Sequence, residues 1–157
     1  MIGDVYRQAA SVLVLRGSGD QREILLLKKP RKNDAWQLPQ GGMEAGEDVT
    51  QAALRELKEE ASLEGCRLLG VSEKIYQYEF PPSFRRFRPD NVRGQQIRFV
   101  FAEAPEDAEV KVDNKEIEGY VWAGIDQLGR YLKRKEYVEL VRELYREVAE
   151  ISESTLR

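Results

Sequence analysis

The 157-residue sequence contains no histidine and a single cysteine, Cys66. Without histidine, the chain cannot carry a serine–histidine or cysteine–histidine catalytic apparatus or a histidine-ligated zinc site. A lone cysteine cannot form an internal disulfide, which favours a reducing compartment, and we expect a cytoplasmic location. Acid–base chemistry, if present, therefore falls to carboxylates, lysine, tyrosine or the cysteine.

Long apolar runs are also absent, and the amino terminus lacks a signal-peptide pattern, so we expect no membrane partner. Lys and Arg number 25 against 28 Asp and Glu, giving a net charge of −3. This balance argues against a general nucleic-acid coating protein, although local basic clusters could still bind phosphate. The length and the 41% apolar content predict a single domain over residues 1–157, and no pattern specifies an oligomeric state.

Hydrophobic patterning predicts a mixture of strands and helices. Segments rich in leucine and β-branched residues predict strands at 10–15, 23–28, 67–78 (one or two strands), 96–103 and 117–122, with a short extended piece at 36–38. Near the carboxyl end, apolar residues recur at helical spacing, at Tyr137, Val141, Leu144, Val148 and Ile151. This periodicity predicts an amphipathic helix over about 136–152, and we favour a role in closing the core over binding a partner.

A second helix is predicted just before the middle of the chain, where the sequence reads LRELKEEASL from Leu54 to Leu63. Asp48 is suited to cap this helix, and Gln51 three residues later completes a capping-box pattern. The helix has an apolar stripe for a core, formed by Val49, Ala53, Leu57 and Ala61.

Three glutamates of this helix, Glu56, Glu59 and Glu60, fall within an arc of about 100° on its surface. Like charges at this spacing destabilise a helix by roughly 0.2–0.5 kcal/mol per pair. Either the face is solvated, or a positive group lies against it.

The segment before the helix, WQLPQGGMEAGED, favours the second explanation. Gly41 and Gly42 permit unusual backbone conformations and close approach to a ligand, and Pro39 stiffens the entry. Such a loop offers backbone carbonyls beside the helix carboxylates, which is an all-oxygen ligand set suited to Mg²⁺ or Mn²⁺. Magnesium commonly completes its shell with substrate phosphates, so this pattern indicates phosphate chemistry.

The same residues carry a resemblance to a known family. Gly41, Glu47, Arg55-Glu56-Leu57, Glu59-Glu60 and Leu63 stand at the spacing of the Nudix box, so the chain resembles the Nudix hydrolases. One fixed position differs, because Ser62 stands where the box has glycine. That residue lies at the expected helix exit, and we consider Gly65 as the residue that takes over the turn.

The resemblance implies an α/β fold, namely a Nudix-type α/β/α sandwich around a mixed β-sheet. It also implies hydrolysis of a nucleoside diphosphate linked to another moiety. Mg²⁺ or Mn²⁺ would be bound by Glu56, Glu59 and Glu60, with the Gly41 carbonyl as a further ligand. Glu47 and Arg55 would form an ion pair that braces the loop on the helix.

Two positions are candidates for the residue that acts as general base. One is the box itself, through Glu59 or Glu60. The other is Glu116 in KEIEGYVW, because this segment resembles one that brings a further glutamate to the metals in some family members. The alternative for Glu116 is an exposed loop glutamate, and we take that alternative for Glu118.

Substrate preference rests on looser matches. The WQLPQGG segment, and Gly94-Gln95 in RGQQIRFVF, resemble the branch that contains RNA 5′-pyrophosphohydrolases and dinucleoside tetraphosphate hydrolases. The resemblance makes Arg7 and Gln95 candidate substrate contacts, and a nucleotide polyphosphate or an RNA 5′ end the expected partner.

Two basic segments are further candidates for binding phosphate or RNA. Arg85, Arg86 and Arg88 alternate with phenylalanines, and arginine with aromatic rings suits phosphates and stacked bases. Lys29 and Lys32 flank the glycine loop. Each segment could instead be an ordinary charged loop.

Three other functions fit part of the pattern. The box alone fixes the chemistry and not the leaving group, so nucleotide sugars or nucleoside triphosphates are alternative substrates. A silent nucleotide-binding Nudix domain is a second alternative, although it would not need the complete set of carboxylates. An acidic helix for protein contacts is a third, but it leaves the glycine loop unexplained.

Overall fold

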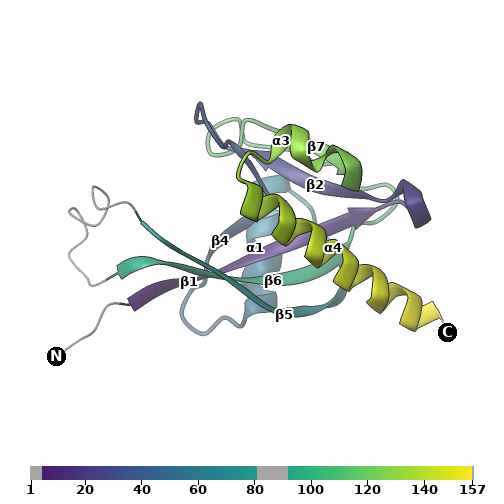
Figure 1. The fold of residues 1–157 in the computed structure, drawn as a ribbon, viewed down its shortest axis with the longest axis horizontal. Helices are drawn as coiled ribbons and strands as arrows, with labels where there is room; N and C mark the ends of the chain where they lie inside the picture. Colours follow the sequence, from purple (N-terminus) through teal and green to yellow (C-terminus); the bar gives the residue numbers. More distant parts are fainter. Residues whose placement is uncertain (1–4, 81–91, 157) are drawn as a thin grey trace.

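The computed structural model describes residues 5–80 and 92–156, which form one mixed sheet with helices on both faces (Figure 1). The strands of this part are β1 (Val5–Arg16), β2 (Glu23–Lys28), β3 (Trp36–Gln37), β4 (Gln40–Gly42), β5 (Arg67–Glu79), β6 (Val92–Glu103) and β7 (Gly119–Gly124). The helices are α1 (Val49–Ala61), α3 (Leu128–Tyr131) and α4 (Lys135–Leu156), with 3₁₀ turns η1 (Gly19–Gln21) and η2 (Ile125–Gln127).

The sheet has the order β3-β2-β1-β6-β5, while β4 pairs with β1 and β7 pairs with β2. β1 and β6 run parallel in unbroken register from Tyr6 opposite Gly94 to Leu15 opposite Glu103. The other pairs are antiparallel. The sheet is therefore mixed, with the first strand of the chain at its centre.

Alternate residues of β1 enter two separate cores, as the two-residue period of a strand requires. Leu13 and Leu15 lie in the core beneath α4, whereas Val12 and Val14 lie in the core beneath α1. All four side chains are buried. Both faces of the sheet are thus covered, which confirms the expected α/β/α sandwich (Figure 1).

The terminal helix α4 contributes Tyr137, Val141, Leu144 and Val148 to its core, which confirms the amphipathic periodicity read from the sequence. In the described part of the chain, no helix is long and apolar enough to cross a membrane.

Several predicted boundaries hold and others are wrong. β2 matches to the residue, and α1 is capped as predicted: Gln51 N donates to the Asp48 carboxylate at 2.8 Å, and Asp48 N donates to the Gln51 side chain at 2.9 Å. The strand predicted at 10–15 begins five residues earlier, at Val5. The strand predicted at 117–122 is shifted by two residues, because Ile117 belongs to the preceding turn. β4, η1, η2 and α3 were not predicted.

The helix exit also differs from expectation. Ser62 itself adopts the left-handed conformation, with φ 57° and ψ 29°, and its N–H donates to the Lys58 carbonyl at 3.0 Å. Gly65 is left-handed as well, but it lies beyond the cap. A Cβ in this conformation is sterically unfavourable, so the serine is strained where glycine would not be.

Replacing Ser62 with glycine should therefore raise the free energy of unfolding by about 0.5–1 kcal/mol, because the strain of the left-handed Cβ is removed. Ser62 is exposed, so the side chain has no core packing to lose. The measurement is urea unfolding followed by circular dichroism. Ser62→Ala is the matched control, since it keeps the Cβ, and an equal gain in both variants would show that backbone strain is not the cause.

Candidate active site

A cavity of about 750 Å³ opens where the β4 loop and α1 meet the sheet. Its lining includes four glutamates that the sequence singles out: Glu56, Glu59, Glu60 and Glu116. It also includes four other predicted residues: Arg7, Lys29, Gly41 and Gln95. Side chains from both ends of the sequence are thus gathered in one place.

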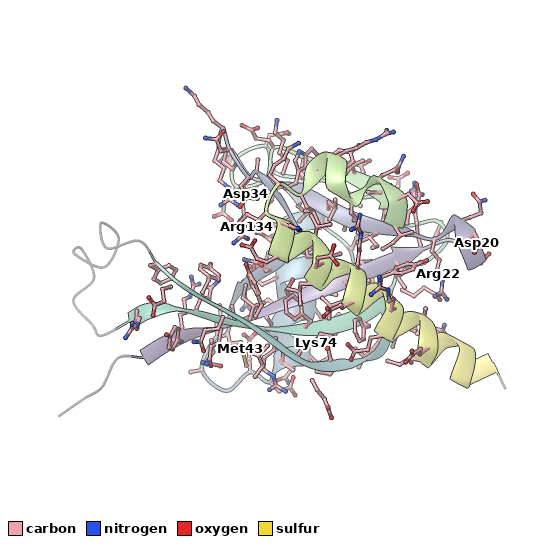
Figure 2. All side chains as sticks on the ribbon, viewed as in Figure 1. Asp20, Arg22, Asp34, Met43, Lys74 and Arg134 are labelled. Atoms are coloured by element: carbon pink, nitrogen blue, oxygen red, sulfur yellow. The ribbon has the colours of Figure 1, made fainter. Side chains whose placement is uncertain are left out.

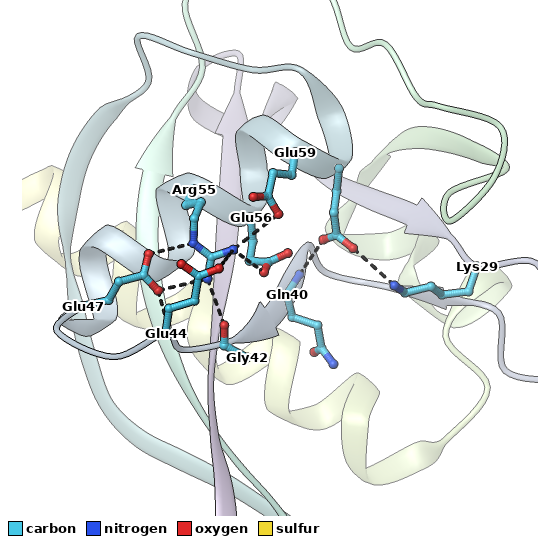
Figure 3. A network of polar contacts seen from close by, with 9 residues as sticks. Lys29, Gln40, Gly42, Glu44, Glu47, Arg55, Glu56 and Glu59 are labelled. Atoms are coloured by element: carbon cyan, nitrogen blue, oxygen red, sulfur yellow. Dashed lines mark hydrogen bonds and ion pairs between the residues drawn. The ribbon is translucent and has the colours of Figure 1, made fainter.

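Arg55 ties the glycine loop to α1, as Figure 3 shows. Its Nε donates to Glu47 at 2.6 Å and one terminal nitrogen donates to the other Glu47 oxygen at 2.9 Å, which is a bidentate pair. The same terminal nitrogen donates to the Gly42 carbonyl at 2.9 Å. The Arg55 hydrogen bonds lower the pKa of Glu47 to about 2. Arg55 therefore fixes the loop against the helix at three acceptors.

The two glycines of β4 each make room for a functional side chain. A Cβ on Gly41 would collide with the carboxylate of Glu56, and a Cβ on Gly42 would collide with the guanidinium of Arg7. Glycine at these positions therefore serves close approach and not backbone conformation, since neither has a positive φ, and a larger residue would push the Glu56 carboxylate or the Arg7 guanidinium aside.

Glu60 is the most enclosed of the box carboxylates, with 5% of its side chain exposed. One oxygen accepts from Gln40 N at 2.9 Å, and the other accepts from Lys29 Nζ at 3.2 Å (Figure 3). Burial raises the pKa of Glu60 to about 7, although both partners favour the charged form.

Glu56 and Glu59 share the remaining terminal nitrogen of Arg55, at 2.8 and 3.3 Å. Burial raises the pKa of Glu56 above its ordinary value, against the opposing effect of Arg55. Each of the three box glutamates is thus paired with one of two cationic side chains of the protein, Lys29 or Arg55, and the cluster keeps a net negative charge. Among the described residues, no three acidic side chains are close enough to hold one metal ion as they stand.

The donor chemistry nevertheless fits a hard divalent cation. Carboxylate oxygens line the cavity from α1, and the Gly41 backbone lies against Glu56 with no side chain between them. The carboxylates already pair with the positive side chains of Lys29 and Arg55, so their surroundings favour positive charge, including that of a bound metal ion.

Glu116 reaches the cavity on a turn organised by Asp113. One Asp113 oxygen accepts hydrogen bonds from the backbone N–H groups of Lys115, Glu116 and Ile117, at 2.9, 3.0 and 3.1 Å. These bonds lower the pKa of Asp113. Ile117 anchors the turn in the core beneath α1, leaving the Glu116 side chain exposed at the cavity.

Some predicted residues lie elsewhere. Lys32 is exposed and does not line this cavity. Glu118 is also outside it and pairs with Lys28 at 3.6 Å. The predicted contacts Arg85, Arg86 and Arg88 fall outside the described residues.

Sequence reasoning missed a row of aromatic residues on one side of the cavity. Ring centroids lie 5.9 Å apart from Tyr137 to Tyr76, 6.0 Å from Tyr76 to Tyr78, and 5.9 Å from Tyr78 to Phe80. Gln95 donates to the Tyr78 hydroxyl at 2.9 Å. The alternation in KIYQYEF places Tyr76 and Tyr78 on one face of β5, and Phe80 continues the same spacing directly after the strand. This two-residue spacing is the sequence pattern that could have predicted the aromatic row.

Arg134, between α3 and α4, was missed as well. Its guanidinium lies 2.9 Å from the Asp34 carboxylate and donates to the Tyr76 hydroxyl at 3.1 Å, and Figure 2 shows Arg134 beside Asp34. It also stands over the Tyr137 ring, with 5.3 Å between the guanidinium carbon and the ring centroid. No local pattern in the sequence indicates this meeting.

The fold and this loop–helix site define a Nudix-type hydrolase, and the chain belongs to the Nudix family. The family model described as NUDIX domain matches residues 5–148. An RNA pyrophosphohydrolase of Rhodospirillum rubrum is 30% identical over 146 residues, covering 88% of this chain and 87% of the relative. One from Rickettsia africae is 32% identical over 146 residues, covering 88% and 89%.

Among solved structures, an Ap4A hydrolase of C. elegans in a binary complex is similar, with a TM-score of 0.72 and 23% identity. The match covers 91% of this chain and 98% of that one. At this identity the likeness establishes the fold, which agrees with the sandwich described above.

Replacing Asp113 with alanine should lower the melting temperature at neutral pH, because three backbone donors of the Glu116 turn lose their acceptor. The folded-state pKa lies below the ordinary value of 3.8, so the ionised carboxylate stabilises the fold above that pH. This contribution is lost as the pH falls through the lower, folded-state pKa. The difference in melting temperature between wild type and variant should accordingly shrink below about pH 4.

The check is thermal unfolding of both proteins from pH 7 to pH 2.5. Asp107→Ala, at another exposed aspartate, is the matched control and should change neither the melting temperature nor its pH dependence. A difference for Asp113→Ala that persists unchanged at the lowest pH would contradict the role of the ionised carboxylate.

Proposed function

We propose that this chain is a divalent-cation-dependent pyrophosphohydrolase that cleaves a phosphoanhydride at RNA 5′-triphosphate or capped ends, or in dinucleoside polyphosphates. The observation that carries the proposal is the composition of one cavity, where Glu56, Glu59, Glu60 and Glu116 accompany basic side chains from separate elements. The basic residues are Arg7, Lys29, Arg31 and Arg134.

The curated relatives support the choice of substrate class. Both relatives reported above are named RNA pyrophosphohydrolases, and each aligns over most of this chain. The box residues alone would fit other nucleoside diphosphate derivatives equally well.

The cation would be held by Glu56, Glu59 and Glu60, with the Gly41 carbonyl as a further oxygen. When bound, Mg²⁺ or Mn²⁺ supplies charge neutralisation for the phosphates and a lowered pKa for the attacking water. Arg55 keeps the loop and helix in register through Glu47 and the Gly42 carbonyl, so the backbone that carries the ligand oxygens is fixed before substrate arrives.

The basic side chains would orient the polyphosphate. The Arg7 guanidinium lies directly against Gly42, just before the loop that leads into α1. Guanidinium groups bind phosphate oxygens in a bidentate manner. The aromatic row of Tyr76, Tyr78 and Phe80 lines the same cavity and offers ring faces on which nucleobases stack. A nucleotide with its phosphates at α1 and its base at β5 fits this distribution of groups.

Glu116 is the better-placed general base. Both oxygens of Glu60 are engaged, by Gln40 and Lys29. In the described part of the structure, by contrast, no donor contacts the Glu116 carboxylate, and the side chain lines the cavity. Its carboxylate would accept a proton from the water that attacks phosphorus, and the phosphate opposite the attacking water would leave.

The experiment that tests the proposal is a hydrolysis screen with Mg²⁺ and with excess chelator. The substrates are triphosphorylated RNA, capped RNA, a dinucleoside tetraphosphate, a nucleotide sugar and a nucleoside triphosphate. Cation-dependent cleavage of the first three supports the proposal. Preference for the nucleotide sugar or nucleoside triphosphate would overturn the substrate class, and binding without any hydrolysis would indicate a nucleotide sensor.

Glu60→Gln and Glu59→Gln should each lower kcat by roughly 100-fold or more, since each weakens the binding of the cation that stabilises the negative charge of the transition state. The folded structure should persist, because glutamine can still accept from Gln40 N. Steady-state kinetics with Mg²⁺ measures the effect. Glu64→Gln, at an exposed glutamate paired with Lys58, is the control. Wild-type turnover in both box variants, or full wild-type activity in chelator, would refute the mechanism.

Glu116→Gln should reduce kcat by roughly 10²–10⁴-fold with little change in KM, as expected for loss of a general base. Glu118→Gln is the neighbouring control and should be near neutral, because Glu118 lies outside the cavity. Small and equal effects of the two substitutions on kcat would instead indicate Glu59 or Glu60 as the general base.

A further inference from the structure

The position of Glu60 favours a nearby cation whenever its carboxylate is charged. Its carboxylate is almost fully enclosed and lies in the last turn of α1, where the helix dipole disfavours negative charge. A buried charge without a partner is strongly destabilising. Lys29 is the cation that meets this need in the structure, at 3.2 Å.

Lys29 is anchored by its backbone and not by its side chain. Its N–H donates to the Ala35 carbonyl at 2.8 Å, and its own carbonyl accepts from Arg31 N at 2.9 Å. These bonds hold the residue at the end of β2. In the described residues, the ammonium has Glu60 as its one polar partner.

Arg55, the other cation of the carboxylate cluster, is held quite differently. Two bonds to Glu47 and one to the Gly42 carbonyl keep its guanidinium in place, even if Glu56 and Glu59 turn to another cation. Lys29 has no such second anchor among the described residues, so loss of Glu60 leaves its ammonium unpaired inside the cavity.

We propose that Lys29 is an exchangeable internal counter-ion: it occupies Glu60 until a divalent cation displaces it, and the released ammonium then binds the phosphates of the substrate. The inference rests on the proposed function, because it assumes that Glu60 is a ligand of the cation. An ammonium and a divalent cation cannot occupy the same carboxylate oxygen at low cost, since like charges repel strongly at such distances.

Two effects of opposite sign follow for one residue. Lys29 weakens binding of the divalent cation, because it competes for Glu60. It strengthens binding of the polyphosphate once the cation is present, because the released charge adds a phosphate contact. Cation and substrate therefore bind cooperatively, and the free enzyme is kept folded without metal.

The test compares wild type with Lys29→Met and with Lys28→Met as the matched control. Lys28 is the adjacent lysine, pairs with exposed Glu118 and lies outside the cavity. Mn²⁺ binding to each protein alone is measured by calorimetry at pH 8.5, where protons do not compete for the carboxylates. Binding of a methylene-bridged, non-hydrolysable dinucleoside tetraphosphate is then measured at saturating Mn²⁺.

Lys29→Met should bind Mn²⁺ about tenfold more tightly than wild type and bind the analogue about tenfold more weakly, within the usual range of coupling between sites. Lys28→Met should match wild type in both measurements. A purely structural role for Lys29 would weaken both affinities. Unchanged or weaker Mn²⁺ binding by Lys29→Met, or unchanged analogue binding, overturns the inference.

A measurement on wild type keeps the inference testable if the methionine variant does not fold. In protein labelled with ¹³C-lysine, addition of Mg²⁺ should shift the Lys29 Cε resonance, assigned with Lys29→Arg, and leave that of Lys28 in place. A Lys29 resonance that does not move at saturating Mg²⁺ contradicts the exchange. If wild type binds no divalent cation at all, the proposed function fails together with the inference; if it binds the cation without these effects, only the inference fails.

Discussion

The contact set of Arg55 is the constraint on which the site depends. One guanidinium joins Glu47 of the loop, the Gly42 carbonyl of β4, and Glu56 of α1. Its five N–H donors lie in one rigid plane, so satisfying these acceptors fixes the distance and orientation between the loop and the helix. The carboxylates are thereby held in position by a residue that need not contact substrate, and lysine could not replace it because a point charge lacks the fork geometry.

The sequence predicted the box loop and helix from one short segment, and it also singled out Arg7, Lys29, Gln95 and Glu116, which come from other segments. The spacing of Gly41, Glu47, Arg55 and the box glutamates is local, and the capping box at Asp48 fixes where the helix starts. The remainder depends on contacts between distant segments. Arg134 contacts Asp34 and Tyr76 only after the sheet and α4 have packed, and no sequence pattern near Arg134 predicts these contacts.

The errors in the predicted strands have the same physical origin. Tyr6, Arg7 and Gln8 show no apolar alternation, yet they are extended because β6 supplies parallel partners at Gly94, Gln95 and Gln96. The glycines of β4 have low strand propensity and are strand only through their pairing with β1. Long-range pairing decides the backbone where side-chain patterning is weak. The pairing of Lys29 with Glu60 also depends on contacts between distant segments, so the sequence singled out Lys29 as a phosphate contact but not as the partner of Glu60.

The parallel pairing of β1 with β6 has a consequence for how the protein is made. Tyr6 finds its partner only at Gly94, and closing a loop of roughly 90 residues costs about 4 kcal/mol of chain entropy before any contact offsets it. The glycine loop and α1 lie inside that loop. On the ribosome, the central strand can pair with β2 and β4 but lacks its parallel partner until β6 has emerged, and chains released before that point would leave this edge of β1 unpaired. Folding should be slow for the size of the protein and sensitive to truncation within β6.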